Sequence, residues 1–183
     1  MASCKKGTEN KTELNKSDFN LKTDYVNFKY KMSELDTIKI FIEHSICTSN
    51  AQERIEITKK VDSLKIKSEY FEATFNKNPK WELVYEKTIS ENDTVWDFGK
   101  FLLRNKKRMS SEKRKSGKIQ IKHKNDTIQL FTNGLLDSFA FFEDFTFTTE
   151  KIYPEYINKI RPVFKRTEML KEEDVKETKL EVE

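Results

Sequence analysis

Two histidines, His44 and His123, are the side chains best suited to acid-base or metal chemistry near neutral pH in this chain of 183 residues. Each lies in a run of alternating isoleucines, so both fall on the apolar phase of a predicted strand. As functional residues they would form a metal pair or supply a general base. As structural residues they would be core or rim histidines satisfied by hydrogen bonds. No set of Cys, Asp or Glu accompanies them at the spacing of metal ligands, so we predict neither a metal site nor another cofactor.

The sequence offers little for nucleophilic or carboxylate catalysis. It contains no Gly-x-Ser-x-Gly turn, and the serines nearest the second histidine (Ser110, Ser111 and Ser116) lie in a basic segment without evident oxyanion donors. Glu143 and Asp144 are neighbours that would point to opposite sides of a strand. We therefore expect a protein that is not an enzyme. An envelope enzyme built on the two histidines is the least favoured alternative.

Basic residues are concentrated between positions 100 and 124, where eleven lysines and arginines face one acid, Glu112, for a net charge of +10. The whole chain carries +4, so the remainder is acidic overall. Such a segment can bind phosphates, anionic lipid or an acidic protein, or it can be a solvated surface near a helix end. We predict that its central residues are rim charges of a partner interface: Arg104, Lys106, Lys107, Arg108, Lys113, Arg114 and Lys115.

Nucleic acid is the less favoured partner of this basic segment. No aromatic residue lies between Phe101 and Phe131, whereas single-stranded nucleic acid usually stacks on aromatic side chains among the basic ones. No helical module typical of duplex binding is evident either. A cytosolic nucleic-acid-associated protein therefore stays the alternative to an acidic protein partner.

The N-terminal string Ala2-Ser3-Cys4, followed by Lys5-Lys6-Gly7 and a polar stretch, resembles the processing site of bacterial lipoproteins. In that family two small residues precede a cysteine that is lipidated after the signal peptide is removed. The resemblance implies a lipid anchor on Cys4 and a domain tethered at the cell envelope, on its periplasmic side or surface. The alternative is a cytoplasmic protein in which Cys4 is an ordinary thiol. No basic and apolar leader stands before Cys4, so we expect the chain as given to begin near the cleavage site.

The hydrophobic pattern predicts an antiparallel sheet. Strict alternation over residues 37–47 indicates a half-buried strand, and similar patterns occur at 54–58, 64–75, 81–85, 119–123 and 128–130. One principal helix is predicted over about 94–108, where Val95, Phe98 and Leu102 share a helical face and Thr94 is placed as an N-cap. A short helix is predicted to begin near Tyr153 and to end before Pro162.

An aromatic-rich run over residues 135–148 follows Asn133-Gly134, which is typical of a tight hairpin turn. We therefore predict a strand there, interrupted by a bulge at Glu143 and Asp144. Adjacent aromatic residues in a strand face opposite ways, so Phe142 could lie on the outer face as an apolar anchor for a partner.

These patterns together predict an α+β protein with a flexible tether over residues 1–33, one domain over 34–166 and a charged tail over 167–183. We expect a non-enzymatic binding protein at a bacterial envelope. Small β-rich lipoproteins of this appearance include immunity or inhibitor proteins that bind a secreted toxin or enzyme through a charged face, and this likeness is one of class rather than of motif. The partner's identity and the oligomeric state are not encoded in these patterns.

Overall fold

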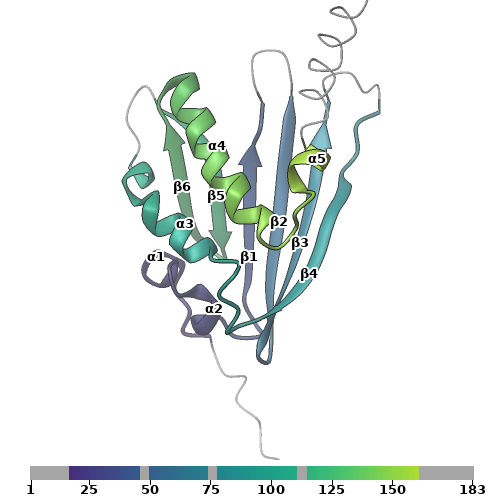
Figure 1. Cartoon of the computed structure of the whole chain (residues 1–183). Helices are drawn as coiled ribbons and strands as arrows, with labels where there is room; N and C mark the ends of the chain where they lie inside the picture. The colour runs from purple at the N-terminus through teal and green to yellow at the C-terminus, as the bar shows by residue number, and fades with distance from the viewer. Residues whose placement is uncertain (1–16, 46–49, 74–77, 111–114, 161–183) are drawn as a thin grey trace, which may run out of the picture.

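A computed structural model of the chain describes residues 17–45, 50–73, 78–110 and 115–160. The described residues form one six-stranded antiparallel sheet in the order β4-β3-β2-β1-β5-β6 (Figure 1). Its strands are β1 (Thr37–Glu43), β2 (Ala51–Lys60), β3 (Ser63–Glu72), β4 (Glu82–Ser90), β5 (Ser116–His123) and β6 (Asp126–Thr132). The α+β class and the antiparallel sheet predicted from the sequence are confirmed.

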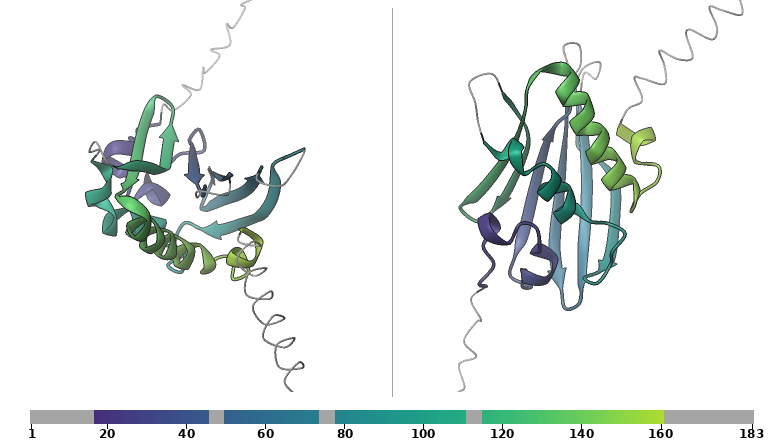
Figure 2. Two further views of the ribbon diagram at one scale, coloured as in Figure 1. Left: turned by 90° about the horizontal axis from the view of Figure 1, so that it is seen from above. Right: turned by 60° about the vertical axis from the view of Figure 1, so that its left-hand side comes forward.

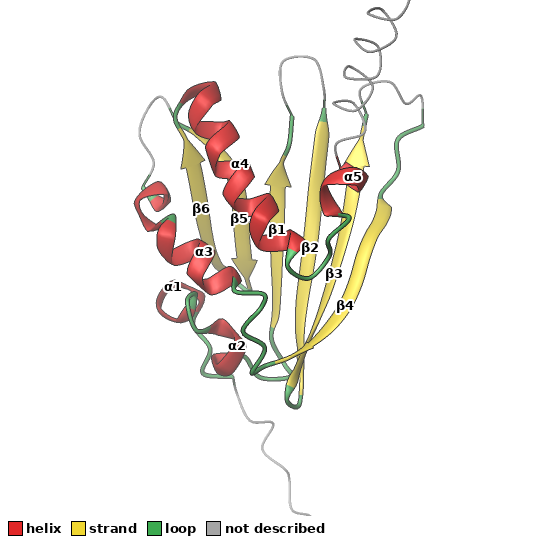
Figure 3. Cartoon of the chain, in the orientation of Figure 1, coloured by secondary structure: helices red, strands yellow, loops and turns green. Residues whose placement is uncertain are grey.

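The helical elements are α1 (Leu21–Asp24), α2 (Phe28–Lys31), α3 (Phe98–Arg104), the 3-10 turn η1 (Lys106–Met109), α4 (Gly134–Glu150) and α5 (Tyr156–Ile160). Figures 2 and 3 show α3, α4 and α5 gathered on one side of the sheet, with α1 and α2 at the end of the same layer. The other face of the sheet carries no helix of the described chain. None of the described helices is long and apolar enough to cross a membrane.

Alternation along the strands sorts side chains between the two faces of the sheet. In β1 the inward residues Ile38, Ile40 and Ile42 are buried, while Lys39 and Phe41 face outward. Residues of β2, β3, β5 and β6 extend the same apolar layer, which packs against aromatic residues of the helices. One face of the sheet is buried and the other is exposed to solvent. A shift of one residue in the pairing would expose the apolar side chains, so the register is strongly specified.

The N-terminal part of the domain differs from the sequence prediction of a tether over residues 1–33. Residues 17–33 form α1 and α2, and Phe19, Leu21 and Phe28 are buried against the sheet and α3. These apolar residues occur at irregular spacing in short helical turns. The sequence therefore shows there neither the period of 2 typical of a strand nor the period of 3.6 typical of a helix. The domain therefore begins by residue 17, while residues 1–16 and 161–183, with Cys4 and the predicted tail, lie outside the described part.

The longest helix is α4, in the segment predicted as an aromatic strand. Gly134 has a φ of +77° and starts the helix instead of turning a hairpin. Phe141, Phe145 and Thr149 recur every four residues on the buried side, which is the period of a helix. The predicted strand, hairpin and bulge were wrong because a run of adjacent phenylalanines fits a buried helix as well as a strand.

The helix predicted over 94–108 exists but is shorter and is not the principal one. Asp97, not Thr94, caps α3 by accepting a hydrogen bond from the backbone N–H of Lys100 (2.9 Å). The helix ends at Arg104 with Asn105 as its C-cap, and the 3-10 turn η1 follows from Lys106. Near Tyr153 the predicted short helix is present as α5.

Candidate binding interface

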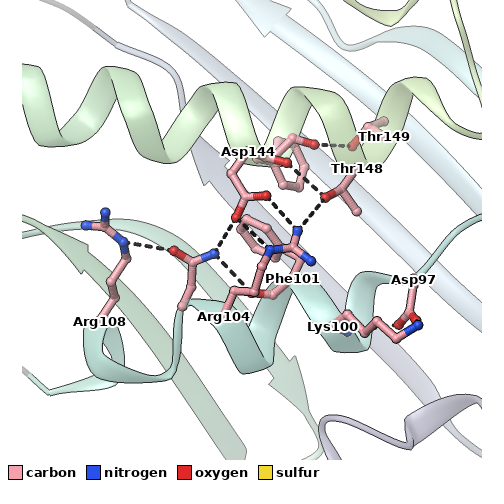
Figure 4. A network of polar contacts seen from close by, with 10 residues as sticks. Asp97, Lys100, Phe101, Arg104, Arg108, Asp144, Thr148 and Thr149 are labelled. Carbon is pink, nitrogen blue, oxygen red and sulfur yellow. Dashed lines mark hydrogen bonds and ion pairs between the residues drawn. The ribbon is translucent and has the colours of Figure 1, made fainter.

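The structure divides the predicted basic interface between two sides of the molecule. Arg104 lies on α3 and donates to Asp144 Oδ1 of α4 (2.6 Å), and Asn105 donates to the other oxygen of the same carboxylate (2.8 Å) (Figure 4). These contacts join the two helices. Arg104 therefore has a carboxylate partner within the domain while its side chain stays 49% exposed, and its role as a rim charge remains a prediction.

Arg108 makes a second link of the same kind. Its guanidinium donates to Asp137 Oδ2 (2.6 Å) at the start of α4. This hydrogen bond and charge hold the pKa of Asp137 below its usual value. Lys106 and Lys107 of η1 remain exposed on this helical side. Lys113 and Arg114 lie outside the described residues, and Lys115 directly precedes β5.

Two further basic residues of the segment, Lys118 and Lys122, lie on β5, whereas Lys100 pairs with Asp97 of the α3 cap and Lys124 with Asp36. Lys122 of β5 lies opposite Lys39 of β1, and Lys118 stands at a bulge earlier in β5. Within the described part of the chain neither Lys118 nor Lys122 has a carboxylate partner. On the uncovered face this segment therefore presents cations that have no carboxylate partner among the described residues, as Lys106 and Lys107 do on the helical side.

A hollow of about 330 Å³ lies between these lysines on the uncovered face. Its outward-facing lining residues come from β1, β2, β5 and β6: Phe41, Glu43, Gln52, Gly117, Lys118, Gln120, Lys122 and Gln129. Gly117 contributes no side chain, and the nearest atoms to a Cβ placed there would be Phe131 Cε1 (3.6 Å) and Gln129 Oε1 (3.8 Å). The bulge and this glycine together leave the space open.

Aromatic residues occur on the same face. Phe41 is 38% exposed, and the Lys122 ammonium lies 5.3 Å from its ring centroid. Toward the β4 edge, the ring of Trp81, the residue before β4, packs on Phe71 of β3 (5.4 Å between centroids) and under the Arg54 guanidinium of β2 (4.3 Å). Exposed aromatic rings beside cations and amides are typical of a protein-binding surface.

Phe142, the predicted apolar anchor, is not on this face. It belongs to α4, is 9% exposed and lies against the His44 ring (5.1 Å between centroids) and Phe141 (5.7 Å). The prediction of an outward Phe142 was wrong because it assumed a strand. Its role in the structure is to pack α4 on the sheet.

His44 takes part in a buried polar cluster around Glu53 of β2. The Glu53 side chain is fully buried and accepts hydrogen bonds from Ser68 Oγ (2.5 Å) and the Tyr156 hydroxyl (2.5 Å). His44 Nε2 lies 3.0 Å from Glu53 Oε2. Glu53 shares the inward phase of Ile55 and Ile57, so an acid in an apolar phase was the sequence signal for this cluster.

Tyr85 of β4 completes this cluster. Its hydroxyl is buried and has no hydrogen-bond partner among the described residues. Burial and the nearby negative charge of Glu53 raise the pKa of Tyr85 well above its usual value of 10. The phenol is therefore neutral, and its chemistry is that of a core residue.

His123 belongs to a second cluster at the opposite end of β1. His123 Nε2 lies 2.8 Å from Asp36 Oδ1, and Lys124 Nζ lies 3.2 Å from the same oxygen. Ser17 and the backbone and hydroxyl of Ser33 donate to the other oxygen. Burial alone would raise the pKa of Asp36, but these hydrogen bonds outweigh it and hold the pKa far below its usual value.

The two histidines therefore do not share a site. Each is paired with a buried acid, as the structural interpretation of the sequence predicted. The described residues contain no group of three His, Cys, Asp or Glu that could hold a metal ion. In the Glu53 cluster, Ser68 donates its hydrogen bond to Glu53 and not to the His44 ring. Activation of a serine nucleophile needs a serine bonded to the histidine and a histidine bonded to the acid, and this arrangement is not present in the cluster.

Comparisons with known proteins give no information on this site. No family model matches the chain, and neither a curated protein nor a solved structure matches it.

Proposed function

We propose that this protein is a non-enzymatic binding protein that docks an acidic protein partner on the uncovered face of its sheet. One observation carries the proposal: this face presents a hollow lined by two lysines, Lys118 and Lys122, that have no carboxylate partner among the described residues. On the helical side, Arg104 of α3 and Arg108 of η1 pair with acids of α4.

Several features of the face favour a protein over a small molecule. The polar residues are spread across four strands, and the aromatic residues are separated by charged pairs such as Arg54–Glu69 (2.6 Å). An open hollow with a polar rim is typical of protein interfaces, whereas small-molecule sites enclose most of their ligand. An immunity or inhibitor protein that binds a secreted toxin or enzyme is the class that these features support best.

The proposed location is the bacterial cell envelope, with a lipid anchor on Cys4. The resemblance of Ala2-Ser3-Cys4 to a lipoprotein processing site supports it, and a cytoplasmic location is the alternative.

The experiment is a capture from cells that express the protein natively, using the full chain. Two charge-reversed variants of equal size are compared, Lys118→Glu/Lys122→Glu on the uncovered face and Lys106→Glu/Lys107→Glu on the helical side. Both variants change the net charge by the same amount. Captured proteins are identified by mass spectrometry, and a stoichiometric candidate is purified and its affinity is measured with each variant.

We expect one purified partner to bind the native chain and the helical-side variant with affinities within about threefold of each other, and the uncovered-face variant at least tenfold more weakly. Equal losses in both variants would show that only net charge matters and would overturn the proposal. Nuclease-sensitive capture with a steep salt dependence would replace the protein partner by nucleic acid.

A further inference from the structure

We infer that the hollow on the uncovered face receives a carboxylate side chain from an extended acidic segment of the partner. This inference rests on the proposed function and specifies the chemistry of the same site. It depends on three properties of the hollow, which are its electrostatic balance, its hydrogen-bond donors and its apolar wall.

The electrostatic balance of the hollow favours an anion. Lys118 and Lys122 contribute two positive charges without carboxylate partners in the described chain. Two acids line the hollow, and the side chain of one of them, Glu53, is fully buried and hydrogen-bonded to Ser68 and Tyr156 on the core side of the sheet. The other acid, Glu43, is on the outward phase of β1 and is already engaged. Its Oε1 accepts from the backbone N–H of Ser45 (3.0 Å), and its Oε2 accepts from Gln52 Nε2 (3.4 Å). An incoming carboxylate would therefore meet a net positive site.

Hydrogen-bond donors stand next to the lysines. Gln120 and Gln129 are directly paired across β5 and β6, and both line the hollow. Each amide side chain has two N–H donors, so the pair can complement the oxygens of a carboxylate that the ammonium groups attract. Charge-assisted hydrogen bonds of this kind give geometric selectivity that charge alone does not.

Phe41 supplies the apolar wall. Phe41 of β1 lies directly opposite Gln120 of β5, and the Lys122 ammonium lies beside its partly exposed ring. The methylene groups of an aspartate or glutamate can pack on this ring while the carboxylate reaches the cations. The volume of about 330 Å³ is at the lower end of the range of roughly 300–1,000 Å³ for ligand sites, which suits one or two side chains rather than a cofactor.

An extended segment fits better than a helix because the hollow is bounded by strands. Its walls follow β1 and β5, which pair antiparallel along Lys39–Ile42 and Ile119–Lys122. In an extended segment bound along these strands, every second side chain points toward the sheet. Acids at alternate positions of the partner would then face the hollow and its lysines.

The test uses two synthetic peptides as defined probes, hexaglutamate and hexaglutamine with blocked ends. Binding to the full-length isotope-labelled chain is followed by NMR amide shifts. We expect hexaglutamate, but not hexaglutamine, to shift the amides of Phe41, Gly117 and Gln120 in a saturable manner. Shifts confined to Lys106 and Lys107, or no saturable shift at all, would overturn the inference.

A variant that fills the hollow separates shape from charge. Gly117→Leu keeps both lysines, and the space around Gly117 accepts a Cβ at ordinary contact distance, so the fold should persist. Thr88→Leu adds a similar side chain to β4, far from the hollow, and is the matched control. We expect Gly117→Leu to weaken hexaglutamate binding at least fivefold and the control to leave it within twofold. Equal binding by both variants would contradict a hollow-specific site.

Failure of this inference is distinguishable from failure of the proposed function. If the purified partner loses affinity for Lys118→Glu/Lys122→Glu but not for Gly117→Leu, the uncovered face is the interface and the hollow is not its recognition point. If neither variant affects the partner, the proposed face itself is wrong.

Discussion

The Tyr85 hydroxyl lies in an environment that lowers the stability of the folded protein. It is buried without a hydrogen-bond partner among the described residues, and an unmet buried hydroxyl costs about 1–3 kcal/mol. Tyr85→Phe removes that hydroxyl and keeps the ring that stacks on Tyr153 (5.3 Å between centroids). We expect the variant to gain about 1 kcal/mol in the free energy of unfolding, measured by urea denaturation at pH 7. A loss of stability would show that the hydroxyl has a partner.

Asp36 makes folding stability depend on pH in a predictable direction. The pKa of Asp36 is lower in the folded protein than the unfolded value of about 3.9, so protons bind preferentially to the unfolded chain in acid. The contribution of Asp36 is complete above pH 4 and decreases as the pH falls toward the folded pKa. Asp36→Asn should lose about 2 kcal/mol at pH 7 and show a shallower loss of stability below pH 4. Unfolding curves from pH 2 to 7 provide the measurement, with exposed Asp62→Asn as control. An unchanged acid slope in Asp36→Asn would contradict the assignment.

Among whole elements, α4 contributes buried phenylalanines to the core from the helical layer. Phe145 is 1% exposed and touches the rings of Phe98, Phe101 and Tyr156, whereas Leu136 on the outer side is 84% exposed. Phe145→Ala should cost about 3–5 kcal/mol, and Leu136→Ala less than about 0.5 kcal/mol. Chemical denaturation of both variants tests the orientation of the helix. Similar costs at the two positions would mean that the helix is rotated or partnered differently.

Elements in which buried apolar residues alternate with outward ones were predictable from the sequence, whereas α4, which carries exposed phenylalanines (Phe139 and Phe147) as well as buried ones, was not. The strand around Ile38, Ile40 and Ile42 follows from strict alternation, and the structure confirms it as β1. In α4, paired phenylalanines obscure the helical period. The preceding Asn133-Gly134 suggested a turn, yet the positive φ of Gly134 serves a helix start.

The candidate site was predicted only in its charge. The basic segment was visible in the sequence, but its division between α3 and β5 depends on which acids α4 brings near Arg104 and Arg108. The hollow depends on a bulge between Gly117 and Ile119, and on register between strands distant in sequence. Contacts between residues that are far apart in the chain produce no local pattern in the amino-acid sequence.

At the scale of the whole molecule, the two buried polar clusters lie at opposite ends of the sheet. Asp36 precedes β1, while Glu53 of β2 pairs with Ile42 near its other end, so about six strand residues, or roughly 20 Å, separate them. They share no hydrogen-bond partner among the described residues. Each cluster secures a different segment to the sheet, the N-terminal helices at one end and α5 at the other.

Because the clusters are distant, their contributions to stability should add. Glu53→Gln should cost roughly 3 kcal/mol, since it disturbs the acceptor of Ser68 and Tyr156 in a buried site. The double variant with Asp36→Asn should differ from the sum of the single variants by less than about 0.5 kcal/mol in urea unfolding. The three variants should also retain one cooperative transition, because a single sheet and core connect both ends. A coupling above about 1 kcal/mol, or two transitions, would show instead that the ends communicate or unfold as separate units.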